Sequence, residues 1–163
     1  MAGYVDRSLI HNSALACFLL ANFVKEYQAL TANTRYPPFE KLLLVLPIVW
    51  HGPSRSSISG RIFSTPMHAV LNDEPRIAER LADRIAAHAA VSCQGLNIAC
   101  ETGLLIKRES ARGEKVFAFG HSHWPRGSKP TTIPGEMLGT TVRLANWFKD
   151  MTGAELFALL GIH

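Results

Sequence analysis

The hydrophobic pattern of this chain opens with a long apolar segment, NSALACFLLANFVKEYQAL, at residues 12–30. Every position from 14 to 21 is apolar, which is typical of a helix that is buried on several sides. Asn12 predicts an N-cap, because its side chain can accept hydrogen bonds from the free amides of the first turn. The following residues, 31–38, end in two prolines and predict a loop.

A second apolar segment, FEKLLLVLPIVW, occupies residues 39–50. Periodicity alone does not distinguish a buried strand from a short buried helix here. We favour a helix that bends near Pro47, where the missing amide removes one helical hydrogen bond. The Gly-Pro pair at 52–53 is expected to end this element. Ser54 then predicts the cap of a new helix that runs to about residue 63.

The middle of the chain has helical spacing. A short helix is expected at 65–73, with Thr65 as its cap and a proline at its first position. EPRIAERLADRIAAHAA, at residues 74–90, predicts the next helix. SCQGLNIACETG, at residues 92–103, predicts a separate helix that is capped by Ser92 and closed by the glycine at its end.

The period then changes to that of strands. LLIKRES (104–110) and EKVFAFG (114–120), which are joined by three residues, predict a β-hairpin. A helix, a second helix and a hairpin follow one another in the second half of a winged helix. Residues 66–123 therefore predict a winged-helix-like module.

The C-terminal part returns to helical spacing after a loop at 121–134 that contains three prolines. Residues 135–151 predict a helix with an apolar face. Thr152 and Glu155 have the spacing of a capping box, in which each side chain bonds the backbone amide of the other residue. A last short helix is therefore expected at the end of the sequence.

Together these elements predict a mainly α protein with a small β-hairpin. The expected architecture is a helical bundle that contains the winged-helix-like helix–helix–hairpin module. A length of 163 residues suits a single domain. Its expected parts are the N-terminal helices (1–65), the winged-helix-like part (66–123) and the C-terminal helices (124–163).

Composition adds a hint of a partner. Apolar residues make up 47% of the chain and charged residues 18%, which is below the usual quarter or so. This balance favours an apolar surface that another subunit covers, although a compact helical monomer also tolerates it. The apolar runs are shorter than the ~20 residues that cross a bilayer. Residues 1–12 lack the features of a signal peptide, so we expect a cytoplasmic protein without membrane contact.

The chain has no motif of a known catalytic site. GxxxxGK[ST], HExxH and GxSxG are all absent from the sequence, so we expect no enzyme and no cofactor. Cys17, Cys93 and Cys100 are expected to be buried thiols rather than disulfide partners. His121 and His123 are the best metal candidates, but zinc usually has three or four protein ligands. Two exposed loop histidines are the simpler interpretation, and a small metal-dependent enzyme remains an alternative.

Three residues after the second apolar segment are candidates for binding a partner. Trp50 has the side chain of an interface anchor, although core packing is the more usual role. His51 is best explained as a helix-end histidine that interacts with the helix dipole. Arg55 can bind a carboxylate or a phosphate with two hydrogen bonds, or it can simply be a solvated arginine.

The hairpin offers a weaker phosphate-binding hypothesis. The helix predicted at 92–102 contains no Lys or Arg, so it is a poor reader of DNA bases. The basic side chains of the hairpin could contact phosphate, although a solvated hairpin is the simpler interpretation. A net charge of +4 does not decide the question. These basic residues are Lys107, Arg108, Arg112 and Lys115.

A family resemblance rests on four stretches in order along the chain. They are NSAL, LLLVLPIVWHGPSR, ERLADRIAAHAAVSCQGLNIACETGLLI and RLANWFKDMTGAELFALLGI. This set resembles the small middle component of bacterial three-component ABC systems, the group that includes Lamassu-type defence systems. The resemblance covers residues 12–162. Ser13 stands where the family has proline, and Leu46, Pro47, His51 and Arg55 match the family's LPLVLH…TR pattern.

The resemblance implies a non-catalytic subunit. In such systems an SMC-like or Rad50-like ABC ATPase senses foreign DNA from phage or plasmid, and an effector, often a nuclease, acts on it. The chain would link the two, with Trp50, His51 and Arg55 at a partner contact and possible non-specific DNA contact within the complex. The alternative is a stand-alone winged-helix DNA-binding regulator.

Overall fold

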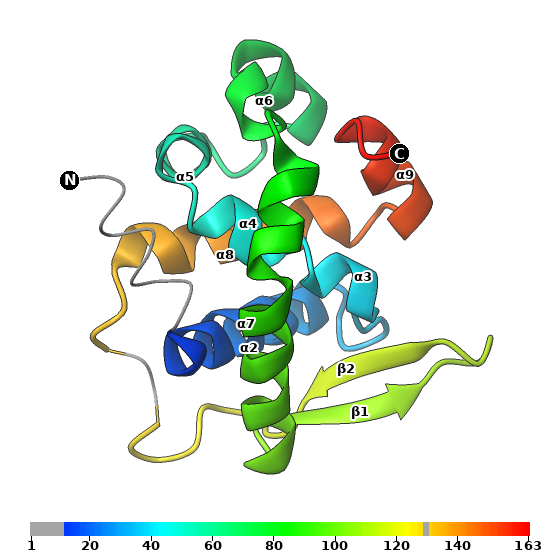
Figure 1. Ribbon diagram of the computed structural model, residues 1–163. Helices are drawn as coiled ribbons and strands as arrows, with labels where there is room; N and C mark the ends of the chain where they lie inside the picture. Colours follow the sequence, from blue (N-terminus) through cyan, green and yellow to red (C-terminus); the bar gives the residue numbers. More distant parts are fainter. Residues whose placement is uncertain (1–11, 129–130) are drawn as a thin grey trace.

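The computed structural model describes residues 12–128 and 131–163. Residues 1–11, on which the signal-peptide prediction rests, lie outside the described part. The centre of the structure is formed by α2 (Ser13–Leu30), α7 (Leu81–Glu101) and α8 (Gly135–Phe148), as Figure 1 shows. Helix α2 packs against both of the others.

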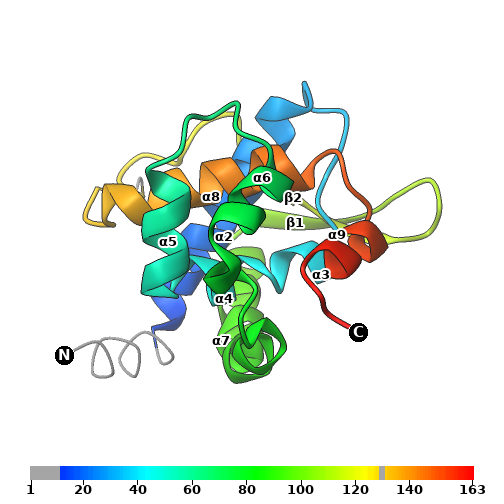
Figure 2. The same cartoon turned by 90° about the horizontal axis from the view of Figure 1, so that it is seen from above.

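Shorter elements surround these helices. The mainly helical fold with a small antiparallel hairpin is confirmed. In Figure 2 the short helix α4 lies between α7 and α8, and it contacts both of them. The remaining elements are α3 (Phe39–Leu42), α4 (Val45–Val49), α5 (Gly52–Ser59), α6 (Met67–Asp73), the 3₁₀-helix η1 (Pro75–Ile77), β1 (Leu105–Glu109), β2 (Lys115–Phe119) and α9 (Gly153–Leu159).

Helix α2 forms as the sequence predicts. The Asn12 side chain accepts a hydrogen bond of 2.9 Å from the amide of Leu15, so the predicted N-cap is confirmed. Most apolar positions of the helix are buried, chiefly by α7, α8 and β2, whereas Ala14 and Ala29 near its ends are exposed. Among the buried positions, Leu19, Leu20 and Phe23 have no exposed surface.

The second apolar segment forms two short helices rather than a strand. The break between α3 and α4 lies at Leu43–Leu44, so the bend precedes Pro47 instead of occurring at it. A proline clashes with the carbonyl four residues earlier, which here belongs to Leu43. Pro47 itself occupies the first turn of α4, where its missing amide has no helical partner to lose.

The predicted starts of α5 and α6 are wrong. Helix α5 begins at Gly52, because a proline in the first helical turn starts a helix rather than ending one. Ser54 is therefore inside α5 and is not its cap. Thr65 does not cap α6, which begins at Met67 without a side-chain cap.

The prediction of two helices within residues 74–103 is also wrong. The first part is the 3₁₀-helix η1 and a turn, and the rest is the single helix α7. Ser92 lies inside α7 and is fully buried, and its low helix propensity costs less than ~1 kcal/mol. Packing of α7 against α2 outweighs that cost. The two helices predicted directly before the hairpin are therefore largely one helix, and the winged-helix-like module is not confirmed.

The hairpin and the last helix agree with the sequence prediction. Strands β1 and β2 pair antiparallel, from Leu105 opposite Phe119 to Glu109 opposite Lys115. The capping box before α9 is present, since the Glu155 amide donates to the Thr152 hydroxyl at 3.1 Å. Within the described residues, no helix has the length and apolar character needed to cross a membrane.

The cysteines are free thiols. Cys17 is buried, and burial raises its pKa to about 11. Cys100 is half-buried, whereas Cys93 is exposed on α7, so the prediction of burial is wrong for Cys93.

Helices α2 and α7 approach closely where they cross. A Cβ atom at Gly95 would lie 2.8 Å from the Ala16 Cβ and 2.9 Å from the Cys17 amide nitrogen. Real side chains do not tolerate such distances, and the α2 backbone cannot move away without disturbing the core. Glycine at this position therefore sets the distance between the two helices.

We predict that Gly95→Ala destabilises the protein. Overpacking of a core costs about 1–3 kcal/mol, which exceeds the gain of at most about 1 kcal/mol from replacing a helical glycine. Urea unfolding followed by circular dichroism measures the difference. Gly135→Ala is the matched control, because nothing lies within 4 Å of its added Cβ. Equal or higher stability of Gly95→Ala would contradict the close crossing.

Candidate docking surfaces

Trp50 belongs to the core in this structure. Its side chain is 2% exposed, and its ring lies 5.7 Å from the ring of His88 on α7. Within the described residues, its indole nitrogen has no hydrogen-bond partner. The tryptophan therefore cannot reach a partner unless this part of the structure rearranges.

Arg55 binds groups of its own chain. Its Nε donates to a carboxylate oxygen of Glu136 at 3.2 Å, and its guanidinium also donates to the Val49 carbonyl at 2.9 Å. These bonds join α5 to the first turn of α8 and to the end of α4. His51 Nδ1 lies 2.6 Å from the Ser54 hydroxyl. Partner binding by Trp50, His51 and Arg55 stays a prediction.

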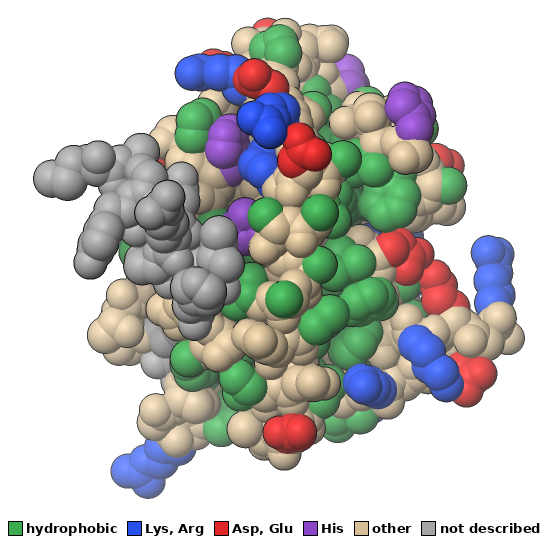
Figure 3. Space-filling view, in the orientation of Figure 1, with side chains coloured by type: hydrophobic (Ala, Val, Ile, Leu, Met, Phe, Trp, Pro, Cys, Tyr) green, Lys and Arg blue, Asp and Glu red, His purple; other side chains and the backbone are tan. Residues whose placement is uncertain are grey.

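The four basic residues of the hairpin do not converge on one point. Lys115 pairs with Glu109 across the strands at 3.3 Å, and the Arg108 guanidinium lies over the Tyr36 ring at 5.3 Å. Lys107 on β1 and Arg112 in the turn are exposed. Figure 3 shows basic and acidic side chains mixed on the projecting hairpin. Phosphate contact by these residues stays a prediction.

Beside the hairpin lies a cleft of about 920 Å³, here called the hairpin cleft. Its walls come from the loop before α3, from the hairpin turn and from the connection between α8 and α9. Basic and acidic side chains alternate around it. The charged residues that line it are Arg35, Glu40, Lys41, Arg108, Glu109, Arg112, Glu114, Lys149 and Asp150.

Lys41 is the buried cation of the hairpin cleft. This residue is 5% exposed. Its Nζ donates to the Tyr27 hydroxyl at 2.9 Å and to the Phe148 carbonyl at 2.8 Å. Burial lowers the pKa of Lys41, and burial raises the pKa of Tyr27 to about 12. Through these bonds Lys41 holds α2, α3 and the end of α8 together.

The pKa values of two acidic residues in the hairpin cleft, Glu114 and Asp150, shift in opposite directions. Desolvation and the neighbouring Glu40 raise the pKa of Glu114 in the hairpin turn. A hydrogen bond from Lys149 lowers the pKa of Asp150. The Lys149 Nζ donates it to a carboxylate oxygen of Asp150 at 2.6 Å. The cleft therefore presents charges of both signs to an incoming group.

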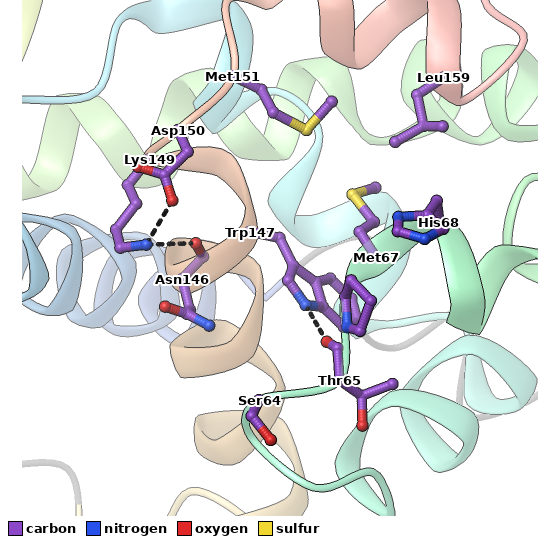
Figure 4. A pocket seen from close by; sticks show the side chains of 11 residues that line it. Ser64, Thr65, Met67, His68, Asn146, Trp147, Lys149, Asp150, Met151 and Leu159 are labelled. Atoms are coloured by element: carbon purple, nitrogen blue, oxygen red, sulfur yellow. Dashed lines mark hydrogen bonds and ion pairs between the residues drawn. The ribbon is translucent and has the colours of Figure 1, made fainter.

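A second hollow, the apolar groove, lies between α6, α8 and α9 and has a volume of about 470 Å³. In Figure 4 the side chains of Met67, Met151 and Leu159 point toward one another near Trp147. The Trp147 indole donates to the Thr65 carbonyl at 2.9 Å, which fixes the ring. Methionine side chains adapt to irregular partner surfaces, so this groove is suited to apolar side chains of another protein.

Two exposed apolar residues precede the apolar groove along the chain, in the connection between α5 and α6. Ile62 is 77% exposed and Phe63 is 40% exposed, and both directly precede Ser64 at the rim of the groove. Asn146, another groove residue, donates to the Phe63 carbonyl at 3.4 Å. Sequence reasoning missed this surface, because the groove brings together residues that are some 80 positions apart.

The histidine pair does not gain a further ligand. His121 and His123 are exposed, and the His121 ring lies 6.2 Å from the ring of Phe119. Among residues 12–128 and 131–163, no group of three or more His, Cys, Asp or Glu side chains is arranged to hold a metal ion.

The fold and the two hollows define a small helical protein with surfaces suited to other proteins. Residues 7–163 match the family model of the ABC-three component (ABC-3C) system Middle Component 3. The chain therefore belongs to this family of middle components, as the sequence resemblance predicts. No curated protein and no solved structure matches it.

We predict that Lys41→Met lowers stability at pH 7 by about 1–3 kcal/mol, because the Tyr27 hydroxyl and the Phe148 carbonyl lose their buried partner. The variant also changes the pH dependence. The folded-state pKa of Lys41 lies below its ordinary value of 10.5, so between the two values the unfolded chain binds more protons. Wild-type stability therefore gains a contribution that rises with pH in that interval, and Lys41→Met lacks it.

Urea unfolding at several pH values between 7 and 10 measures both effects. Above pH 10 the raised pKa of Tyr27 acts in the opposite direction, so this range is avoided. Lys25→Met is the control, because the Lys25–Glu26 pair is a partly exposed contact at 3.9 Å of the kind that contributes little. A Lys41→Met variant with the stability and pH profile of the wild type would contradict the role of this lysine.

Proposed function

We propose that this chain is a non-catalytic docking subunit in a bacterial, cytoplasmic ABC three-component defence system. In this role it links an SMC-like or Rad50-like ABC ATPase, which senses phage or plasmid DNA, to an effector that is often a nuclease. Membership of the middle-component family supports a place among the other components. A Lamassu-type system is the variety that the sequence resemblance favours.

The apolar groove is the observation that carries this proposal. A single exposed apolar side chain is ordinary on a protein surface. Here the exposed Ile62 and Phe63 immediately precede Ser64 of a groove that is itself lined by Leu159, two methionines and a tryptophan. Burying one large aliphatic side chain contributes about 1.5–3 kcal/mol. A partner that covers this patch would therefore gain substantial affinity.

The position of the two hollows supports a linking role. The apolar groove and the hairpin cleft share Lys149, Asp150 and Met151 in the connection between α8 and α9. One hollow has a mainly apolar surface, and the other is lined by nine charged residues among apolar and polar ones. Two partners with different surface chemistry could thus bind on either side of this connection.

The predicted contact at Trp50, His51 and Arg55 takes a secondary place in the proposal. A partner carboxylate would have to compete with Glu136 for Arg55, whose guanidinium already has its own hydrogen bonds. We propose that the main role of this cluster is to fix α5 next to α8. It would contact a partner at most through its exposed edge.

The alternative DNA-binding regulator gains no support from α7. Gln94 and Asn97 are exposed on this helix, but Gly95, Leu96 and Ala99 are buried. The exposed face therefore offers few polar groups and no cation to bases. Within a complex, the exposed Lys107 and Arg112 remain available for non-specific contact with phosphate.

We predict that Ile62→Asp combined with Leu159→Asp weakens assembly at least tenfold. Both side chains are exposed, so the folded chain tolerates the change while the groove loses its apolar rim and gains charge. Co-purification with the other two components, expressed from the same operon, measures the effect. Ala86→Asp, at an exposed position of α7, is the control.

Normal recovery of the complex with the double variant would show that the apolar groove is not the docking surface. Binding of the isolated chain to duplex DNA, with affinity that falls steeply as salt rises, would instead favour the regulator.

A further inference from the structure

The two strands of the hairpin bond each other through alternate residues. The Ser110 amide donates to the Glu114 carbonyl at 2.8 Å, and the Gly120 amide donates to the Leu104 carbonyl at 2.9 Å. In an antiparallel pair, hydrogen-bonded and non-hydrogen-bonded positions alternate. The even-numbered residues of β1 therefore bond β2, and the backbone groups of its odd-numbered residues point to the opposite side.

The outer edge of β2 is covered by the rest of the chain. The Phe117 amide donates to the Pro37 carbonyl at 3.0 Å, and the Phe119 amide donates to the side-chain oxygen of Gln28 on α2. A β-bridge between Pro38 and Val116 extends this contact. The outward amides of Phe117 and Phe119 thus have partners.

The outer edge of β1 is open. In the part of the chain that the structure describes, no hydrogen bond is present at the outward amides of Lys107 and Glu109. Both side chains are exposed, and the neighbouring Ile106 is 43% exposed. Figure 1 shows β1 on the outer side of the hairpin, with β2 between it and the loop before α3.

We propose that β1 accepts an extended strand from another component of the three-component system. The incoming strand would bond the free N–H and C=O groups of Lys107 and Glu109 and extend the hairpin to a three-stranded sheet. This inference deepens the proposed docking function and rests on it. It names a second contact, which differs in chemistry from the apolar groove.

The side chains of β1 indicate what the incoming strand carries. Opposite charges directly across two strands stabilise a sheet, and like charges destabilise it. An acidic side chain therefore fits opposite Lys107, and a basic one fits opposite Glu109. On the other face of the strand, an apolar side chain fits opposite the exposed Ile106, and a second acidic one fits opposite Arg108.

A second copy of this chain is a poor occupant of the edge. Antiparallel pairing of two β1 strands centred on Lys107 would place the two lysines opposite each other, and pairing centred on Arg108 would place the two arginines opposite each other, although it also opposes Lys107 to Glu109. Parallel pairing in register would place Lys107 beside Lys107 of the other copy, and Arg108 beside Arg108. Charged residues on edge strands prevent self-association in this way, whereas an acidic strand from a different protein is attracted.

Amide hydrogen exchange tests the proposal directly. In the free protein, the amides of Ile106 and Arg108 are expected to exchange slowly, because they lie in the hairpin ladder, and those of Lys107 and Glu109 rapidly. In the complex with the co-expressed components, Lys107 and Glu109 should slow at least tenfold. Rapid exchange at both positions in an intact complex would overturn the proposal.

A proline substitution separates the contribution of the Lys107 backbone amide from that of its side chain. Lys107→Pro removes an amide that points away from β2, which a proline on an edge strand tolerates. We expect it to weaken assembly at least tenfold, whereas Lys107→Ala keeps the amide and weakens assembly less than threefold. Slow exchange at Ile106 and Arg108 verifies that the variant hairpin is intact. An intact Lys107→Pro variant that assembles like the wild type would overturn the proposal.

These outcomes distinguish the two proposals. If the components do not co-purify with the wild-type chain at all, the docking function fails, and the edge contact fails with it. If the complex forms and Lys107 and Glu109 remain rapidly exchanging, the edge proposal alone fails. Slowed exchange that depends on the concentration of the free protein would identify a second copy as the occupant and also overturn the proposal.

Discussion

The close crossing of α2 and α7 at Gly95 is the constraint on which the other contacts depend. It brings α7 against an α2 helix whose apolar residues require cover on all sides. Helix α8 and β2 complete that cover. Because the hairpin follows directly after α7, this crossing also brings the hairpin beside α2. Gln28 then bonds β2, and β1 becomes the outer strand.

A buried cation and a half-buried one hold the short helices around this centre. Arg84 on α7 donates to the carbonyls of Pro47, Ile77 and Glu79, and Lys41 joins Tyr27 to the end of α8. Desolvation lowers the pKa of both residues. In each case one charged side chain donates hydrogen bonds to several backbone or phenol oxygens. These bonds help to keep the short helices in place.

Local signals in the sequence predicted the elements whose causes are local. The apolar run of α2, its Asn12 cap, the hairpin and the capping box before α9 all depend on residues within a few positions of one another. Ser54 and Ser92 looked like caps, but serine also occurs inside helices. The proline in the first turn of α5 decided the case of Ser54, and packing of α7 against α2 decided that of Ser92. The Glu136 partner of Arg55 and the groove around Trp147 join distant residues, so no local pattern could reveal them.

The open edge of β1 is likewise a product of tertiary structure. Either strand of a hairpin can be the outer one, and here Pro37 and Gln28 select β2 for cover. In the proposed docking, the apolar groove and this edge would contribute different things. Burial of apolar side chains gives affinity with little directional preference, whereas a strand edge fixes direction and register through its hydrogen bonds. A subunit that links two larger proteins needs both, because affinity without orientation would hold its neighbours together without aligning them.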